Sequence, residues 1–356
     1  MIPRMSSGAI PTLQKAVQIE NPGPEARIFV RDDVPVGNPG PYEVLIEIGF
    51  TGVCGSEVRA LRGWGTYDPI VGHEGIGNVV KLGENVPQSL LDQRVGVKWL
   101  YRACGECSVC VRGFSNNCPR QLNTGKHRPG TLQQYVVADS RYLTRIPQGI
   151  SDKEAAPLLC AGLTMIGAIS MLENDLSRGD WVVIQGAGGG LGHLGVQIAS
   201  KMKGLRVIAV DTGHEKQLFT EALGAEAYID YAIDDLEKVV MDLTEEGAHG
   251  IVVVPGSEEA YRIAPKLVRS MGTIVCVGLP HNDFQLPVSV TQCAIKALTI
   301  KGAMVGTEEQ MTELLQEASK GTVRAAVETY NFTDVPDILN RLAGEQITGR
   351  AVVSCL

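Results

Sequence analysis

The sequence has no cluster of basic residues and no long apolar run, and each absence argues against a class of function. Lysine and arginine total 32 against 40 aspartates and glutamates, which gives a net charge of −8. A protein that binds nucleic acid needs a concentrated basic face to contact phosphates, so we expect no nucleic-acid partner. No segment reaches the roughly 18 uninterrupted apolar residues of a membrane span, so we expect no membrane association either.

The opening residues, MIPRMSSGAIPT, lack the apolar core of a secretory signal, and the chain has no internal repeat or low-complexity segment. We therefore expect a cytoplasmic protein, in a compartment where thiols stay reduced. Under that expectation the nine cysteines are candidates for metal ligands before disulfides. The length of 356 residues is sufficient for two domains, because a single core rarely grows beyond about 250–300 residues.

The first part of the chain has the pattern of an antiparallel β body. Its first 150 residues are rich in Gly and Pro and contain short strand-like runs, such as Val44–Phe50 and Gly77–Gly83. Short strands between turn residues are typical of a barrel-like arrangement. The tail from about Lys301 combines one helix with two strand-like segments, so we expect residues 301–356 to complete the domain formed by residues 1–160.

The middle of the chain alternates strands with helices. Apolar Trp181–Gln185 and Arg206–Asp211 have the pattern of buried strands, and amphipathic His193–Met202 has that of the helix between them. Apolar strands separated by helices indicate a parallel sheet covered on both faces. Residues 161–300 are therefore predicted to form a second domain, and the fold class is α/β.

Four cysteines lie close together in one predicted loop. Cys104, Cys107, Cys110 and Cys118 follow the spacing C-x2-C-x2-C-x7-C. Four thiolates this close can surround zinc, and they leave no coordination position for a substrate, so we predict a structural site that orders a small lobe. An iron–sulfur cluster stays open, because the spacing does not exclude it. A zinc ribbon that binds nucleic acid is the functional alternative, and the acidity of the chain disfavours it.

Other possible metal ligands are dispersed along the chain. Cys54 follows a strand-like run, His73 and Glu74 lie in VGHEGIG, and Cys160 lies in LLCAGLT. Each has an ordinary structural explanation, since a buried cysteine in an apolar run usually belongs to the core. Their spacing alone does not identify a site.

A glycine-rich loop, GAGGGLG, connects the strand Trp181–Gln185 to the helix His193–Met202. Glycines let the backbone approach a pyrophosphate, whose charge then meets the helix N-terminus. Asp211 ends the next strand, and a carboxylate there binds the adenosine ribose and repels a 2′-phosphate, which favours NAD over NADP. A glycine-rich turn beside a solvated aspartate is the ordinary alternative. The cofactor-binding residues predicted in the loop are Gly186, Gly188, Gly189, Gly190, Leu191 and Gly192.

These features occur together in the zinc alcohol dehydrogenases of the medium-chain dehydrogenase/reductase superfamily, and the chain resembles the yeast-type members from about Lys15 to Val353. The stretches that carry the resemblance include GVCGSE, VGHEGIG, LLCAGLT, GAGGGLGHLGVQIA and ITGRAVV. The resemblance implies a GroES-like, mainly β catalytic domain and a Rossmann domain with a doubly wound parallel sheet. It also implies NAD, two zinc ions per subunit, one catalytic and one structural, and a homodimer or homotetramer.

The resemblance also implies roles for individual residues. Cys54, His73 and Cys160 match the ligands of the catalytic zinc, and Glu74 matches a position that can enter the metal shell. Ser56 matches the hydroxyl that carries the substrate proton. Among further matches, Glu57 replaces the aspartate that orients a ligand histidine, and the residues matched to the ribose and pyrophosphate of the cofactor are Lys216 and Arg350.

Two positions depart from the family pattern. Gly55 stands where relatives place a histidine or arginine near the cofactor phosphates, so we expect weaker NAD binding than in a typical relative, partly offset by Arg350. Arg59 stands where many relatives carry the histidine that ends the proton relay. Because arginine stays protonated, it cannot act as a general base. We therefore expect alcohol oxidation to be slow below alkaline pH and carbonyl reduction to be favoured.

The function these features predict is hydride transfer between NAD(H) and a small alcohol or its aldehyde or ketone. A specialised biosynthetic carbonyl reductase with the same zinc chemistry is one alternative, and a non-catalytic dinucleotide-binding protein is another. Residues near motifs that line the substrate pocket in relatives are Trp64, Trp99, Leu279 and Met304, and a place in the hydrophobic core is the equal alternative for all four. Leu61 and Met304 favour a substrate larger than ethanol.

Overall fold

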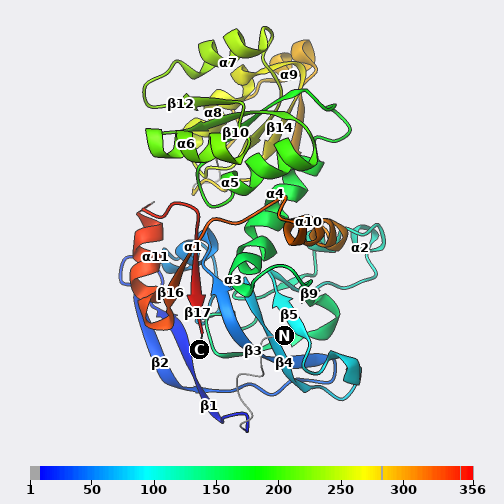
Figure 1. Cartoon of the computed structure of the whole chain (residues 1–356), viewed down its shortest axis with the longest axis vertical. Coiled ribbons are helices and arrows are strands. Elements are labelled where there is room, and N and C mark those ends of the chain that lie inside the picture. The colour runs from blue at the N-terminus through cyan, green and yellow to red at the C-terminus, as the bar shows by residue number, and fades with distance from the viewer. Residues whose placement is uncertain (1–8, 282–283, 345, 356) are drawn as a thin grey trace.

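The computed structural model describes residues 9–281, 284–344 and 346–355, which form two bodies stacked along the long axis of the molecule (Figure 1). The lower body in this view contains both the beginning of the chain and its last strand. The upper body is formed by the middle of the chain.

The lower body is built around a seven-stranded sheet. Its strands are β3 (Glu43–Gly52), β4 (Gly75–Leu82), β5 (Arg94–Val97), β8 (Tyr135–Asp139), β9 (Thr144–Arg145), β16 (Val327–Asn331) and β17 (Arg350–Ser354). Strand β3 pairs antiparallel with β17, β4 and β8, which makes it the centre of the sheet. Its alternate residues Val44, Ile46 and Ile48 are fully buried, as the two-residue period of a strand requires when one face meets the core.

Smaller elements surround this sheet. β1 (Leu13–Glu20) and β2 (Arg27–Pro35) form an antiparallel hairpin, and α1 (Gly55–Leu61) contacts α11 (Val335–Ala343). A separate lobe contains the elements β6 (Leu100–Arg102), α2 (Ser108–Val111) and β7 (Leu122–Asn123).

The upper body is a six-stranded parallel sheet in the order β12-β11-β10-β13-β14-β15. Its strands are β10 (Trp181–Gln185), β11 (Arg206–Asp211), β12 (Ala227–Asp230), β13 (Ala248–Val253), β14 (Val268–Cys276) and β15 (Thr299–Gly302). The helices around it are α5 (Gly192–Gln197), α6 (His214–Leu223), α7 (Leu236–Thr244), α8 (Glu258–Leu267) and α9 (Val290–Lys296). The strand order reverses between β10 and β13, and at such a point a doubly wound sheet binds ligands beyond the carboxyl ends of its strands.

Both faces of the upper sheet are buried, as the continuous apolar pattern of β10 predicts. Val182 and Ile184 belong to one hydrophobic cluster, whereas Trp181 and Val183 belong to another on the opposite face. The second cluster includes Val240 of α7 and residues of α8. Alternation between two cores explains why all five residues of β10 are buried.

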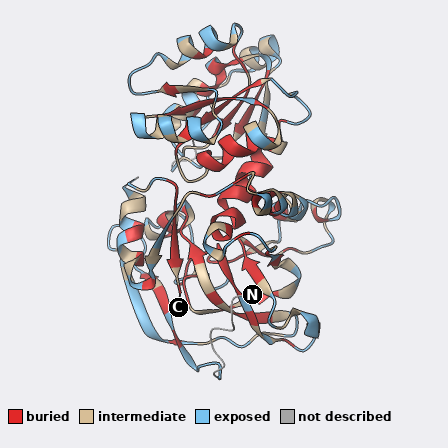
Figure 2. Ribbon diagram, in the orientation of Figure 1, coloured by how far each residue is buried: buried red, intermediate tan, exposed pale blue. Residues whose placement is uncertain are grey.

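The two bodies share one hydrophobic core. Between them lie α4 (Ala161–Ser170) and α10 (Glu308–Lys320), whereas α3 (Asp152–Ala155) packs against β3 and β4 of the lower sheet. The cluster that contains Met165 of α4 also contains Ile184 of the upper sheet and Val352 of the lower one. Figure 2 shows the buried residues of α4 between the two bodies.

The predicted α/β class, with a mainly β body and a doubly wound parallel sheet, is confirmed. Strand β15 continues to Gly302, two residues beyond the domain limit of residue 300 expected from the sequence, because residues 299–302 pair with β14. Within the described ranges, no helix combines the length and apolarity that crossing a membrane requires.

Candidate active site and metal centres

Four potential metal ligands from three segments converge in the lower body. They are Cys54, His73, Glu74 and Cys160, all buried, with ligand atoms within 4.8 Å of one another. Thr51 of β3 lies opposite Gly75 of β4 in the antiparallel register, which places the residue just after β3 beside those just before β4. Cys160 joins them from the turn that enters α4. The sheet and this turn therefore assemble the cluster.

The dimensions and chemistry of the cluster fit a zinc ion. The Sγ atoms of Cys54 and Cys160 are 3.9 Å apart, and Nε2 of His73 is 3.2 Å from Sγ of Cys160. Sulfur atoms bound at about 2.3 Å in a tetrahedron lie about 3.8 Å apart. The hydrogen bond with Cys160 lowers the pKa of the Cys54 thiol well below its ordinary value, which favours the thiolate that a metal requires.

Glu57 supports the cluster from α1. Its Oε1 lies 2.9 Å from Nδ1 of His73, and its Oε2 accepts a hydrogen bond from the backbone N–H of Cys54 at 2.5 Å. Burial is the largest single influence on His73 and works to lower its pKa, but the charges of Glu57 and Cys54 and the hydrogen bonds with both residues together raise the pKa well above its ordinary value. Glu57 therefore contacts the histidine, as the sequence predicts, although it is one methylene longer than the usual aspartate.

Glu74 connects the cluster to the upper body through Arg350. The buried Arg350 guanidinium donates to Oε1 of Glu74, while Oε2 has no hydrogen-bond partner among the described residues. Burial raises the pKa of Glu74 to about 8, although the charge of Arg350 opposes this. A Cβ added at Gly190 would lie 3.0 Å from Cδ of Arg350. Arg350 thus lies between the metal cluster and the glycine-rich loop.

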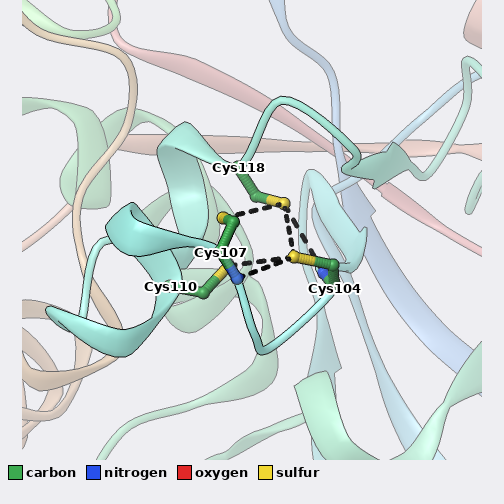
Figure 3. A group of neighbouring side chains, drawn as sticks. All are labelled: Cys104, Cys107, Cys110 and Cys118. Atoms are coloured by element: carbon green, nitrogen blue, oxygen red, sulfur yellow. Dashed lines mark hydrogen bonds between the residues drawn. The ribbon is translucent and has the colours of Figure 1, made fainter.

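The second cluster is formed by the four cysteines of the small lobe (Figure 3). The Sγ separations are 3.8 Å for Cys104–Cys110, 3.9 Å for Cys107–Cys118 and 3.5 Å for Cys104–Cys118. None of the four is in a disulfide. The backbone N–H of Glu106, first among several donors, lowers the pKa of Cys104 to about 6. Four converging sulfurs at these separations fit a tetrahedral zinc site.

The glycine-rich loop has the geometry that a dinucleotide requires. A Cβ at Gly192 would lie 2.0 Å from the carbonyl oxygen of Gly186, so only glycine fits there. Gly186 itself has a φ of 67°, in the left-handed region. The helix that follows runs through α5 and a π-helical segment to Met202. The loop therefore turns tightly onto a helix N-terminus, as predicted.

Asp211 lies where the sequence places it, at the carboxyl end of β11. Its buried carboxylate accepts hydrogen bonds from the backbone N–H of Gly188 at 2.8 Å and from that of Thr212 at 2.9 Å. Lys216 donates to the same carboxylate at 2.7 Å. The structure thus brings Asp211, Lys216 and the glycine-rich loop together.

The two residues that depart from the family pattern both lie on α1. Gly55 is exposed, and a Cβ there would have nothing within 4 Å. Arg59 donates through Nη1 to the carbonyl oxygen of Leu279 at 3.1 Å, and its guanidinium lies 5.6 Å from the ring centroid of Trp64. Half-buried Ser56 lies one helical turn before Arg59. The position that the sequence matches to a relay histidine therefore carries an arginine whose guanidinium bonds to a backbone carbonyl.

The four residues predicted to line the substrate pocket occupy different surroundings. Trp99 contacts His73 edge-on, with ring centroids 5.1 Å apart, so it borders the metal cluster. The ring of Trp64 packs against that of His281, with the ring centroids 4.0 Å apart. Leu279 and Met304 are 66% and 44% exposed, although the carbonyl of Met304 accepts a hydrogen bond from the cysteine lobe. Of the four, Trp99 is the one directly beside the proposed ligands.

One buried polar residue was not singled out by the sequence. His193 follows the glycine-rich loop and is completely buried, with hydrogen bonds to both bodies. A histidine at a helix position otherwise occupied by apolar residues is the signal that could have identified it.

Two domains, a doubly wound parallel sheet and two zinc-type clusters define the class of protein as a zinc-binding dehydrogenase. Residues 40–148 match the alcohol dehydrogenase GroES-like domain, and residues 190–320 match the zinc-binding dehydrogenase family. The chain belongs to the zinc-containing alcohol dehydrogenases of the medium-chain dehydrogenase/reductase superfamily. It is an oxidoreductase that uses zinc and NAD to interconvert a small alcohol and its carbonyl compound.

Relatives and solved structures match nearly the whole chain. Alcohol dehydrogenase 2 of Emericella nidulans is 38% identical, with 98% of this chain and 99% of the relative covered. An alcohol dehydrogenase of Schizosaccharomyces pombe is 37% identical, with 93% and 94% covered. The alcohol dehydrogenase structure from Aeropyrum pernix has a TM-score of 0.86 at 28% identity and covers 96% of this chain and 99% of that one. Acetophenone reductase from Geotrichum candidum in complex with NAD has a TM-score of 0.85 at 27% identity, with 98% of both chains covered.

Proposed function

We propose that Cys54, His73 and Cys160 hold the catalytic zinc of this alcohol dehydrogenase. Glu74 is proposed as a further residue that can enter the coordination shell of the metal. The observation that carries this proposal is the convergence of their ligand atoms within 4.8 Å in a buried site. When bound, zinc supplies Lewis-acid chemistry that lowers the pKa of an alcohol or polarises a carbonyl, and NAD supplies the hydride acceptor. The complete ligand set does not support a non-catalytic dinucleotide-binding protein.

Protein groups around the cluster orient its ligands and move the proton. Glu57 holds the ring of His73 from the Nδ1 side, which leaves Nε2 directed toward Cys160. Ser56 is proposed to accept the substrate proton, since it lies in the first turn of α1, two residues after Cys54. Arg59 cannot relay that proton onward, so we propose that the proton leaves through water, through the cofactor ribose or through another residue. Carbonyl reduction is therefore the favoured direction near neutral pH.

We assign NAD binding to the glycine-rich loop, Asp211, Lys216 and Arg350. The loop residues that would contact the pyrophosphate are Gly186, Gly188, Gly189, Gly190, Leu191 and Gly192. Asp211 is buried and already accepts three hydrogen bonds, so a 2′-phosphate beside it would meet a fixed negative charge. This arrangement supports NAD over NADP. Because Gly55 stands where relatives place a basic side chain near the cofactor phosphates, we expect weaker NAD binding than in a typical relative.

We propose that residues 1–160 with 301–356 form the catalytic domain and that 161–300 form the NAD-binding domain. Within the first, Cys104, Cys107, Cys110 and Cys118 are proposed to bind the structural zinc. The exposed edge strand β15 and its apolar neighbours, with Val290 86%, Ile295 78% and Ile300 41% exposed, support a homodimer or homotetramer paired along this edge. We further propose a cytoplasmic enzyme without nucleic-acid or membrane partners, in keeping with its net charge of −8.

A specialised carbonyl reductase is the second candidate, and the fixed cation of Arg59 is the observation that favours it. The similarity to acetophenone reductase makes an aryl ketone a suitable test substrate. The experiment is a panel of primary, secondary and aromatic alcohols with their aldehydes and ketones, run with NAD(H) and NADP(H) beside zinc quantitation. Turnover with NAD and two zincs per chain support the proposal, whereas an absence of zinc at the Cys54 cluster contradicts it.

A further inference from the structure

His193 lies at the junction of the glycine-rich loop and the lower body. It is fully buried, its Nδ1 lies 2.9 Å from the carbonyl oxygen of Gly189, and its Nε2 accepts a hydrogen bond from the backbone N–H of Ala326 at 3.2 Å. Because Nε2 accepts, the proton of the neutral ring is on Nδ1 and is donated to Gly189. Burial lowers the pKa of His193 to about 4, which is consistent with a neutral ring.

The contacts of His193 continue to the metal cluster. The carbonyl of Ala326 accepts a hydrogen bond from the backbone N–H of Arg350 at 2.8 Å. Arg350 begins β17, and its guanidinium pairs with Glu74 of the ligand cluster. An unbroken series of hydrogen bonds thus joins Gly189 of the dinucleotide loop to Glu74, through His193 and Arg350.

The same arginine also touches the loop directly. A Cβ at Gly190 would lie 3.0 Å from Cδ and 3.1 Å from Nη1 of Arg350. A change in the loop on dinucleotide binding would therefore reach Arg350 by two routes. It would displace the side chain directly, and it would displace the backbone through His193 and Ala326. Both routes end at the buried Glu74 carboxylate, whose Oε2 has no hydrogen-bond partner among the described residues.

We propose that His193 is a positioning residue that couples dinucleotide binding to the catalytic metal cluster. It fixes Ala326 relative to Gly189, and so fixes the backbone from which Arg350 reaches Glu74. Filling of either site then alters affinity at the other by the same factor, as thermodynamic linkage requires. The inference rests on the proposed roles of the Cys54 cluster and of the glycine-rich loop.

Substitution of a neighbouring residue, Gln197, provides a control that distinguishes coupling through His193 from a general loss of packing between the two bodies. Gln197 lies one turn further along the same helix, is also buried, and joins the same two bodies through paired hydrogen bonds with Arg324. Its side chain also donates to the backbone carbonyl oxygen of His193 at 3.0 Å, but it makes no hydrogen bond to the His193 ring, to Ala326 or to Arg350. Gln197→Met therefore weakens the connection between the bodies while leaving in place the hydrogen bonds that link Gly189 to Glu74 through His193, Ala326 and Arg350.

Two substitutions at His193 separate its two hydrogen bonds. His193→Asn keeps a donor near Nδ1 but removes the acceptor for Ala326. His193→Gln places an amide oxygen near the position of Nε2 and retains that acceptor, while the backbone N–H of residue 193 still donates to the carbonyl oxygen of Gly189 at 3.1 Å. If the Ala326 bond carries the coupling, the Asn variant loses it and the Gln variant recovers it.

The test compares NADH affinity of the zinc-loaded enzyme with that of enzyme whose catalytic metal has been removed by selective chelation, using calorimetry. We expect the two dissociation constants of the wild type to differ by about fivefold or more, within the usual range of coupling. The ratio should fall below about twofold in His193→Asn and stay near the wild-type value in His193→Gln and Gln197→Met. Chelator-driven metal loss, measured with and without NADH, should change by the same factor.

Three results would overturn the proposal: no difference in the wild type, an unchanged ratio in His193→Asn, or an equal loss in Gln197→Met. Hydrogen exchange of residues 324–327 in the wild type provides a measurement that needs no variant. NADH should slow their exchange more in the zinc-loaded enzyme than in the chelated one, and equal slowing contradicts the coupling. Failure of the proposed function itself would look different, since the wild type would then lack either the second zinc or NADH binding.

Discussion

The two cysteine-containing sites of this enzyme are built in opposite ways. Cys104 and Cys118, which limit the first site, are 14 positions apart on one loop, and two of its four cysteines, Cys104 and Cys107, are partly exposed. Cys54 and Cys160 of the second are 106 positions apart, and all four of its residues are buried. The first site therefore depends on a metal to give its lobe a core, whereas the fold assembles the second.

The core sizes around the two sites support this difference. The lobe contributes only four buried apolar residues to its own cluster, and two of these, Cys110 and Cys118, are proposed ligands. By contrast, the residues that flank Cys160 belong to the large cluster shared by both bodies. Loss of metal should thus unfold the lobe but leave the dispersed site folded.

The largest expected effect is on the lobe. Cys110→Ala removes one of four proposed ligands, and the binding of a structural zinc is worth on the order of 10 kcal/mol to a small site. We expect one zinc fewer per chain, rapid proteolysis within residues 104–118 and a clear fall in Tm. Ser115→Ala, in the same loop, is the matched control and should change none of these. Retention of both zincs in Cys110→Ala would contradict the assignment.

The opposite outcome is expected at the dispersed site. Cys160→Ala should abolish NAD-linked turnover, by about a thousandfold or more, or ~4 kcal/mol of transition-state stabilisation. It should leave the lobe zinc bound and the protein folded, because the surrounding core is intact. Activity assays and thermal unfolding check this. A fall in Tm as large as that of Cys110→Ala would contradict the claim that only the lobe depends on its metal for stability.

Glu57 tests whether the dispersed site depends on its surroundings. Glu57→Gln keeps the size of the side chain but removes the charge beside Nδ1 of His73. We expect metal affinity or kcat to fall by about 10–100-fold, as for other residues that orient a metal-bound histidine. Competition with a chelator measures the affinity. An unchanged affinity and kcat would mean that the contact with His73 has no functional role.

Arg59→His tests the missing proton relay. A histidine at this position can accept a proton near neutral pH, and a positioned general base usually accelerates reaction by about 100-fold or more, although a half-exposed site should give nearer tenfold. Alcohol oxidation at pH 7 should therefore rise, while oxidation at pH 10 changes little. Arg59→Lys, which keeps the cation, is the control. No rise at pH 7 would remove the proposed reason for slow oxidation.

An effect of similar size, about tenfold, is expected on NAD affinity at Gly55. The open space beyond this residue accepts a side chain, so Gly55→Arg can place a cation toward the cofactor phosphates. NAD should bind about tenfold tighter, equivalent to ~1.4 kcal/mol. Calorimetry with Gly55→Ala as the uncharged control measures this. Equal affinities for the two variants would show that the position does not face the phosphates.

The same contrast explains what the sequence could predict. The spacing of Cys104–Cys118 and the strand–loop–helix context of Gly186–Gly192 are local, so both were predicted from the residues themselves. The ligands Cys54, His73 and Cys160 are distant in sequence, and they were gathered only through the family resemblance. The antiparallel register of β3 and β4 supplies the physical reason that two of them meet.

Long-range contacts account for what the sequence did not reveal. The hydrogen bond from Arg59 to the Leu279 carbonyl spans 220 positions, and that from Ala326 to His193 spans 133. Neither has a local pattern, because each joins the two bodies at a point set by their packing. In the sequence, a polar residue at the contact between the two bodies can be recognised only because it interrupts an otherwise apolar pattern.

The zinc content of purified wild type and Cys160→Ala, measured beside NAD-linked turnover, tests the central claim most directly. The account predicts two zincs per chain and activity in the wild type. It predicts one zinc, no activity and a folded protein in Cys160→Ala. A single zinc in the wild type, or full turnover in Cys160→Ala, would contradict the division into one catalytic and one structural site.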